Sequence, residues 1–112
     1  MMAQYQKISD FFEDEPATWG LRGDRYLWRE MRAHFSDAPI PENVSLLEKQ
    51  VLQAFLELTG QPISTQKHFR VAQFAHGGLS SGGISPGFWR NRALPLLKKR
   101  YTESFTFAGD NK

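Results

Sequence analysis

The sequence predicts a small, single α+β domain with three to four helices and a short two- or three-stranded antiparallel sheet. Apolar residues recur at helical spacing through much of residues 5–58, and a segment rich in β-branched and aromatic residues follows at 68–75. The length of 112 residues, of which 40% are hydrophobic and 13% aromatic, suits one core. We therefore expect one domain over 1–112, with an ordered core at about 5–107.

The first helix is expected over residues 5–14. Its apolar residues Ile8, Phe11 and Phe12 fall on one side at i, i+3 and i+4 spacing, and Pro16 follows as a terminator. Acidic residues gather at its C-terminal end, where they oppose the helix macrodipole. Packing against the rest of the core is therefore needed to hold this helix.

A second helix is expected over residues 25–35, with Asp24 as its N-cap. The Asp24 side chain would accept a hydrogen bond from a backbone N–H one turn into the helix. Four apolar residues form the stripe that is expected to be buried, and three arginines fall on the opposite, polar side. The apolar residues are Leu27, Trp28, Met31 and Phe35, and the arginines are Arg25, Arg29 and Arg32.

The third helix, over residues 42–58, has the strongest helical pattern in the chain. Its apolar residues form a broad face, and Gly60 is placed to end it because glycine readily takes the left-handed conformation at a helix C-terminus. The residues of this face are Val44, Leu47, Val51, Leu52, Phe55, Leu56 and Leu58.

Three segments are candidates for the short sheet. Residues 68–75 combine β-branched and aromatic side chains with imperfect alternation, which favours a strand. A short strand is also expected at 63–65, and an edge strand at 104–107, where the sequence alternates. Together these segments give the two or three strands, which we expect to pack on the helix at 42–58.

Residues 76–87 form a segment with five glycines and three serines, too many for regular structure of any length. Ser85 followed by Pro86 is typical of a helix start, with serine as N-cap and proline in the first turn. Phe88, Trp89 and Ala93 are expected on the inner side of that helix. Pro95 is expected to interrupt it, since proline lacks the N–H and clashes one turn back, and residues 96–101 then resume as a helix.

Charge is unevenly distributed along the chain. Residues 1–58 hold ten carboxylates and six lysines or arginines, a net charge of −4, whereas residues 59–112 hold two carboxylates and eight lysines or arginines, a net charge of +6. Such asymmetry indicates an anion-binding surface in the second half. The alternative is that the acidic half covers the basic half in the fold.

The glycine–serine segment and the arginines that follow it are the candidate binding site. Consecutive N–H groups in a glycine-rich turn can cradle an anion, and the segment leads into a helix N-terminus. The alternative is a tight connection that needs left-handed residues. The candidate binding residues are His76, Gly77, Gly78, Ser80, Ser81, Gly82, Gly83, Ser85, Arg90 and Arg92.

Catalysis is the second hypothesis for this segment, although the absence of a catalytic signature favours a non-enzymatic module. His76 is the weak candidate for an acid or base in a small enzyme that binds a phosphorylated or carboxylated ligand, with Ser80 or Ser81 as nucleophile and Asp24 as the residue that orients the histidine. The three histidines lack metal-ligand spacing and the chain has no cysteine, so we expect neither a metal nor another cofactor.

The favoured function is therefore a binding or regulatory module that holds an acidic partner through residues 76–87 and the adjacent basic residues. A protein partner or self-association is favoured. Non-specific nucleic-acid binding is a third hypothesis, based on the basic cluster Lys98, Lys99 and Arg100 near the C-terminus.

No apolar run reaches the length of a membrane span or a signal peptide, so we expect no membrane association and a cytoplasmic location.

Overall fold

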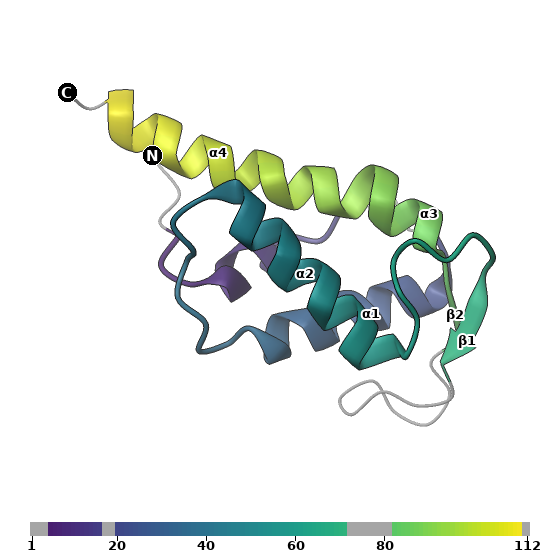
Figure 1. The fold of residues 1–112 in the computed structure, drawn as a ribbon. Helices are drawn as coiled ribbons and strands as arrows, with labels where there is room; N and C mark the ends of the chain where they lie inside the picture. Colours follow the sequence, from purple (N-terminus) through teal and green to yellow (C-terminus); the bar gives the residue numbers. More distant parts are fainter. Residues whose placement is uncertain (1–4, 17–19, 72–81, 111–112) are drawn as a thin grey trace.

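The structure, a computed structural model, describes residues 5–16, 20–71 and 82–110, the last six of these by their backbone only (Figure 1). It confirms the predicted fold class, with helices as the main elements and one two-stranded antiparallel sheet. The elements in chain order are the 3₁₀ helix η1 (Ile8–Phe12), α1 (Arg22–His34), α2 (Val44–Thr59), β1 (Phe69–Val71), β2 (Gly82–Ile84), α3 (Pro86–Phe88), the π-helical turn η2 (Trp89–Ala93) and α4 (Leu94–Asp110).

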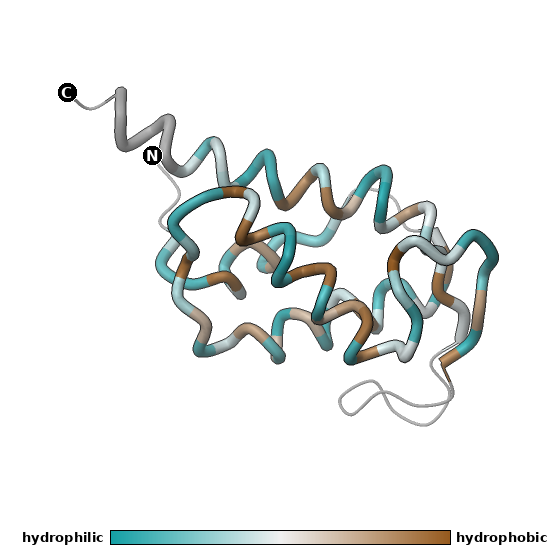
Figure 2. The backbone as a smooth tube through the Cα atoms, viewed as in Figure 1, coloured by the Kyte–Doolittle hydropathy of each residue, from teal (hydrophilic) through white to brown (hydrophobic). Residues whose placement is uncertain are grey.

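The helices enclose a single core. In Figure 1, α4 runs along one side of the molecule, and α2 packs against both α4 and α1. The helix η1 contacts α1 and α4, and the sheet lies at the end of the molecule where α1 begins. Along α2 and α4 hydrophobic residues recur turn by turn between hydrophilic ones (Figure 2), as expected for helices that bury one side only.

Aromatic side chains fill the centre of this core. The rings of Trp28 and Trp89 lie 6.1 Å apart between their centroids, with Phe12 against Trp28 at 4.8 Å and Phe55 against Trp89 at 5.9 Å. The indole N–H of Trp28 donates to the carbonyl oxygen of Phe12 at 2.9 Å, so this buried polar group is satisfied. The core thus joins the N-terminal, central and C-terminal segments.

The helices differ from the sequence-based expectations mainly at their ends. The first helix is a 3₁₀ helix of five residues rather than a helix over 5–14, although Ile8, Phe11 and Phe12 are buried as predicted. The second begins at Arg22, so that Asp24 occupies the third helical position and is not the N-cap. At the end of α2, Gly60 has a φ of 79° and its N–H donates to the Leu56 carbonyl, as predicted.

The sheet is smaller than the three-stranded alternative. Phe69, Arg70 and Val71 pair with Ile84, Gly83 and Gly82, respectively, so the end of the glycine–serine segment is a strand. Residues 63 and 64 form a turn instead of a strand, which the hydrogen bond from the Thr65 N–H to the Pro62 carbonyl closes. Residues 104–107 are helical, since α4 continues to Asp110.

Pro95 does not interrupt the C-terminal helix. The chain is helical from Pro86 to Asp110, but it passes through the π turn η2 just before the proline. The N–H of Leu94 donates to the carbonyl of Trp89, five residues back. Proline is tolerated in the first turn of a helix, and Pro95 is the second residue of α4. The wider turn thus allows the helix to continue past the proline.

Ser85 caps the start of this helical stretch at Pro86, as predicted. The Ser85 hydroxyl accepts a hydrogen bond from the Phe88 N–H at 3.3 Å.

Candidate functional site

Asp24 connects the start of α1 to the segment that follows β2. Its side chain is fully buried, and one carboxylate oxygen accepts from the Leu21 N–H at 2.7 Å. The other accepts from the Ser85 N–H at 3.1 Å and from the indole N–H of Trp89 at 2.8 Å. Three donors from two distant parts of the chain therefore converge on one carboxylate.

Burial raises the pKa of the Asp24 carboxyl above its ordinary value. Hydrogen bonds from Ser85, Leu21 and Trp89 act in the opposite direction, because each stabilises the charged form, and a smaller lowering comes from His68. Desolvation is the larger effect. The sequence-based hypothesis paired Asp24 with His76, which lies outside the described residues. The described partners of the Asp24 carboxylate are these three donors.

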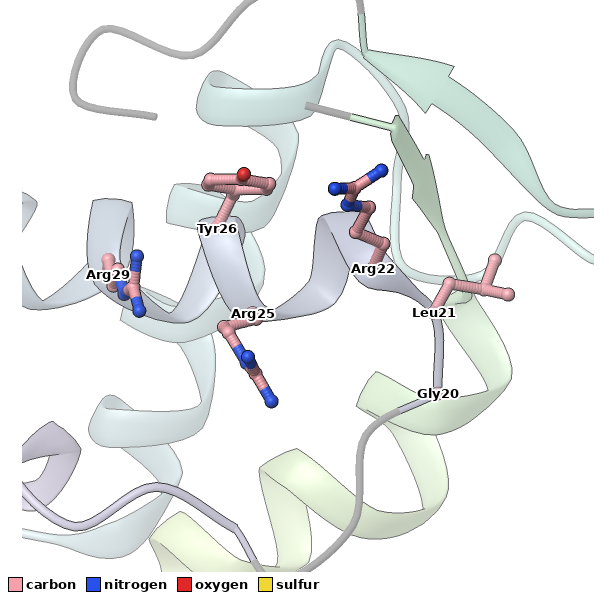
Figure 3. Close-up of a pocket in the computed structure, with 6 residues that line it drawn as sticks. All are labelled: Gly20, Leu21, Arg22, Arg25, Tyr26 and Arg29. Carbon is pink, nitrogen blue, oxygen red and sulfur yellow. The ribbon is translucent and has the colours of Figure 1, made fainter. Parts of the chain in front are cut away.

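Three arginines surround a pocket at the exposed side of α1. Arg22, Arg25 and Arg29 are exposed and lie at i, i+3 and i+7, and the half-buried Tyr26 lies among them (Figure 3). With Gly20 and Leu21 they line a pocket of about 460 Å³. Among the described residues that line it there is no acidic side chain. The pocket is therefore strongly cationic.

Two of these arginines have no partner within the described residues. Neither the Arg22 nor the Arg29 side chain forms a hydrogen bond or an ion pair there, in contrast to the side chain of Arg32 on the same helix, which lies 3.8 Å from that of Glu13. Arginine is always charged at physiological pH and presents donors that match carboxylate and phosphate groups. These two side chains thus keep their full donor capacity for a ligand.

Three basic residues of the C-terminal half have structural partners instead. The Arg90 guanidinium donates to the carbonyl oxygens of Ile63 at 2.9 Å and Thr65 at 3.0 Å, which holds the turn after α2. Lys98 pairs with Glu48 at 3.2 Å. Arg100 donates to the Phe11 carbonyl, and its guanidinium lies 5.9 Å from the Trp28 ring centroid.

Arg92 and Lys99 remain exposed beside a second pocket. This pocket has a volume of about 390 Å³ and is lined by Pro16, Phe88, Asn91, Arg92, Pro95, Leu96 and Lys99. It is a neighbour of the arginine pocket, because a Cβ added at Gly20 would lie 2.7 Å from the Cβ of Phe88. The described lining residues of this second pocket also include no acidic group.

The glycine–serine segment is described only from Gly82 onward. The predicted site residues His76, Gly77, Gly78, Ser80 and Ser81 lie outside the described residues.

Of the other predicted site residues, Gly82 and Gly83 are in β2, and the Ser85 N–H is engaged by Asp24. A Cβ at Gly82 would lie 3.7 Å from the Cβ of Arg22, so this end of the segment borders the arginine pocket.

The arginine pocket was not predicted from the sequence, although the spacing of its arginines is visible there. The i, i+3, i+7 spacing of Arg22, Arg25 and Arg29 places them along one helix side. We expected instead a helix that begins at Arg25, without Arg22 on its polar side. Recognising the pocket required knowing that α1 begins three residues earlier and that β2 packs against its first turn.

Comparison with known protein families, with curated proteins and with solved structures found no match for this chain. Within the described part of the chain, no helix combines the length and the apolar character that crossing a bilayer requires. Among the same residues, no cluster of three or more histidine, aspartate or glutamate side chains is placed to hold a metal ion. The fold defines a small α+β domain. The candidate site is the arginine pocket at the start of α1.

Proposed function

We propose that this protein is a non-enzymatic binding module that holds an acidic partner on the arginine pocket of α1, beside Gly82 and Gly83. The observation that carries the proposal is that Arg22 and Arg29 are exposed and have no partner among the described residues, at a pocket whose described lining contains no acidic group. The cysteine-free composition supports a cytoplasmic location for this activity.

The energetics favour a partner with several negative charges. An exposed ion pair contributes only about 0.2–1 kcal/mol, so one carboxylate on one arginine would bind weakly. Three guanidinium groups along one helix side add their contributions and also attract the partner over a distance. We therefore expect binding that is multivalent and that weakens as salt is added.

The roles of three other cations support this choice of surface. Arg90, Lys98 and Arg100 each hold another part of the chain in place. Replacing them would disturb the fold together with any binding. The side chains of Arg22 and Arg29 hold no other described element in place. Replacing them should therefore remove accessible charge without disturbing the fold.

A heparin column provides a first test because heparin is a generic polyanion. The variant with Arg22→Ala and Arg29→Ala should elute at a clearly lower NaCl concentration than the wild-type protein. The matched control carries Lys49→Ala and Lys67→Ala, which remove the same charge from two exposed lysines elsewhere, and should elute close to the wild-type protein. Equal retention of the two double variants would refute the proposed site, since retention would then reflect net charge alone.

A further inference from the structure

We infer that the acidic partner is a single-stranded nucleic acid whose phosphates contact the arginines of α1 and whose bases stack on Tyr26. This inference rests on the proposed function and names the class of partner for the same site. It draws on three features of the described residues: the spread of the guanidinium groups, the tyrosine between them, and the second basic pocket nearby.

The guanidinium groups do not converge on one point. In Figure 3 the Arg22 and Arg25 side chains point in different directions from their shared side of α1, and Arg29 lies almost two turns beyond Arg22 along the helix. With a rise of about 1.5 Å per residue, Arg22 and Arg29 are separated by roughly 10 Å along the helix axis. A compact anion would reach only part of this set, whereas a chain with one charge per repeat can contact all of it.

Tyr26 adds a feature that an acidic peptide would not use. Its ring packs against the hydrophobic core and also lines the pocket, so it is held in place while remaining accessible. Aromatic rings beside cationic groups are the usual surface on which unpaired bases stack. The bases of a duplex are already stacked on one another, so they would not reach this ring. The site therefore fits a single strand better than a duplex.

The second pocket extends the same surface. Gly20 lines the arginine pocket and packs beside Phe88, which lines the pocket of Arg92 and Lys99. A strand seated on Tyr26 would thus find two further cations beyond Gly20, Arg92 and Lys99, which have no partner within the described part of the chain. We expect affinity to rise with strand length until both pockets are occupied.

The test is fluorescence anisotropy with labelled oligothymidylates of about 4 and about 12 nucleotides, a duplex of the longer length, and a labelled oligoglutamate peptide. The wild-type protein should bind the 12-mer more tightly than the 4-mer, the duplex or the peptide. Tyr26→Leu keeps an apolar side chain against the core but removes the ring, and it should weaken 12-mer binding about tenfold. Tyr26→Phe keeps the ring and should bind within about twofold of the wild-type protein.

Salt dependence gives an independent measure of the phosphate contacts. For a single strand, each contact contributes about 0.7 to the slope of log Kd against log salt concentration. The double variant with Arg22→Ala and Arg29→Ala should therefore lower that slope by about 1.4. Lys49→Ala with Lys67→Ala should leave it unchanged. An unchanged slope in the arginine variant would overturn the inference.

The remaining outcomes separate the inference from the function on which it rests. If the peptide binds in an arginine-dependent way and the oligonucleotides do not, the acidic-partner function stands and the nucleic-acid inference is wrong. Equal affinity for the duplex and the 12-mer, equal affinity for the two strand lengths, or an unaffected Tyr26→Leu variant would each overturn the inference. If neither the peptide nor any oligonucleotide binds at low salt, both fail.

Discussion

At the scale of single residues, Asp24 determines how the start of α1 is joined to the C-terminal helix. Its two oxygens serve different donors, with Leu21 on one and Ser85 and Trp89 on the other. Asp24→Asn keeps an oxygen for Ser85 and Trp89 but turns an amide group toward the Leu21 N–H, so a donor faces a donor. We expect a loss of about 1–3 kcal/mol in the free energy of unfolding, measured by urea denaturation at neutral pH.

The control for this measurement is Asp37→Asn, which changes an exposed carboxylate with no partner among the described residues. It should leave the free energy of unfolding within about 0.5 kcal/mol of the wild-type value. A similar loss in both variants would mean that net charge, and not the hydrogen bonds of Asp24, is responsible.

The raised pKa of Asp24 also predicts how that loss depends on pH. The unfolded chain loses this proton near the ordinary value of 3.8, whereas the folded protein retains it to higher pH. The stability that follows from the raised pKa is therefore fully present below 3.8 and is lost as the pH rises through the folded pKa. The free energy of unfolding of the wild-type protein minus that of Asp24→Asn should be larger at about pH 3 than at neutral pH. A difference that grows with pH would show that the hydrogen bonds outweigh desolvation.

Only the local position of Asp24 could be predicted from the sequence. The sequence correctly places Asp24 at the start of a helix, but it assigns the residue as the N-cap, whereas Asp24 is the third residue of α1. Its other partners, Ser85 and Trp89, lie 61 and 65 residues further along the chain. No local pattern contains that pairing, so the burial of the carboxylate depends on tertiary packing alone.

At the scale of elements, the contact between α1 and β2 depends on Gly23. A Cβ at this position would overlap the carbonyl oxygen of Gly83 in the backbone of β2, which cannot move away as a flexible side chain could. Gly23→Ala should therefore destabilise the protein by about 1–3 kcal/mol, although alanine is ordinarily better than glycine inside a helix. Thermal or urea unfolding measures this directly.

Gly87→Ala is the matched control because its Cβ would meet only the end of the Arg90 side chain, at 3.8 Å. It should leave the protein unchanged or stabilise it by up to about 1 kcal/mol. If both alanine variants were stabilising, the close approach of α1 to β2 would be wrong, and with it the position of Gly82 beside Arg22.

The elements that could and could not be predicted differ in length and surroundings. The long apolar pattern of α2 has several turns of consistent spacing, and its end at Gly60 has a local cause. The segments at 63–65 and 104–107 are too short for alternation to distinguish a strand from a turn or a helix. For 104–107 the preceding helix decides, since extending α4 adds hydrogen bonds without a new nucleation step.

At the scale of the whole molecule, the net charge of each half of the sequence does not by itself locate the accessible cations. The acidic half does meet the basic half, as the pair of Glu48 and Lys98 shows. Arg22 and Arg29, which have no partner in the described ranges, nevertheless belong to the half with a net charge of −4. Which charges remain accessible depends on the partners that the fold supplies, so a count along the chain does not locate the cationic surface.

This distribution makes a prediction about the stability of the free protein. Arg22 and Arg25 are like charges at i, i+3, and Arg25 and Arg29 are like charges at i, i+4, which costs about 0.2–0.5 kcal/mol for each pair at low salt. Arg22 also places a positive charge in the first turn of α1, where the macrodipole is unfavourable to cations. The variant with Arg22→Ala and Arg29→Ala should therefore be at least as stable as the wild-type protein at low salt.

The measurement is thermal unfolding of both proteins across a series of NaCl concentrations. Salt screens the repulsion, since the Debye length falls from about 30 Å at 0.01 M to about 3 Å at 1 M. The advantage of the variant should therefore shrink as salt is added. A variant that is less stable than the wild-type protein at every salt concentration would mean that these arginines support the fold. A variant that is more stable but binds polyanions less well would show that the repulsion among them is tolerated for binding.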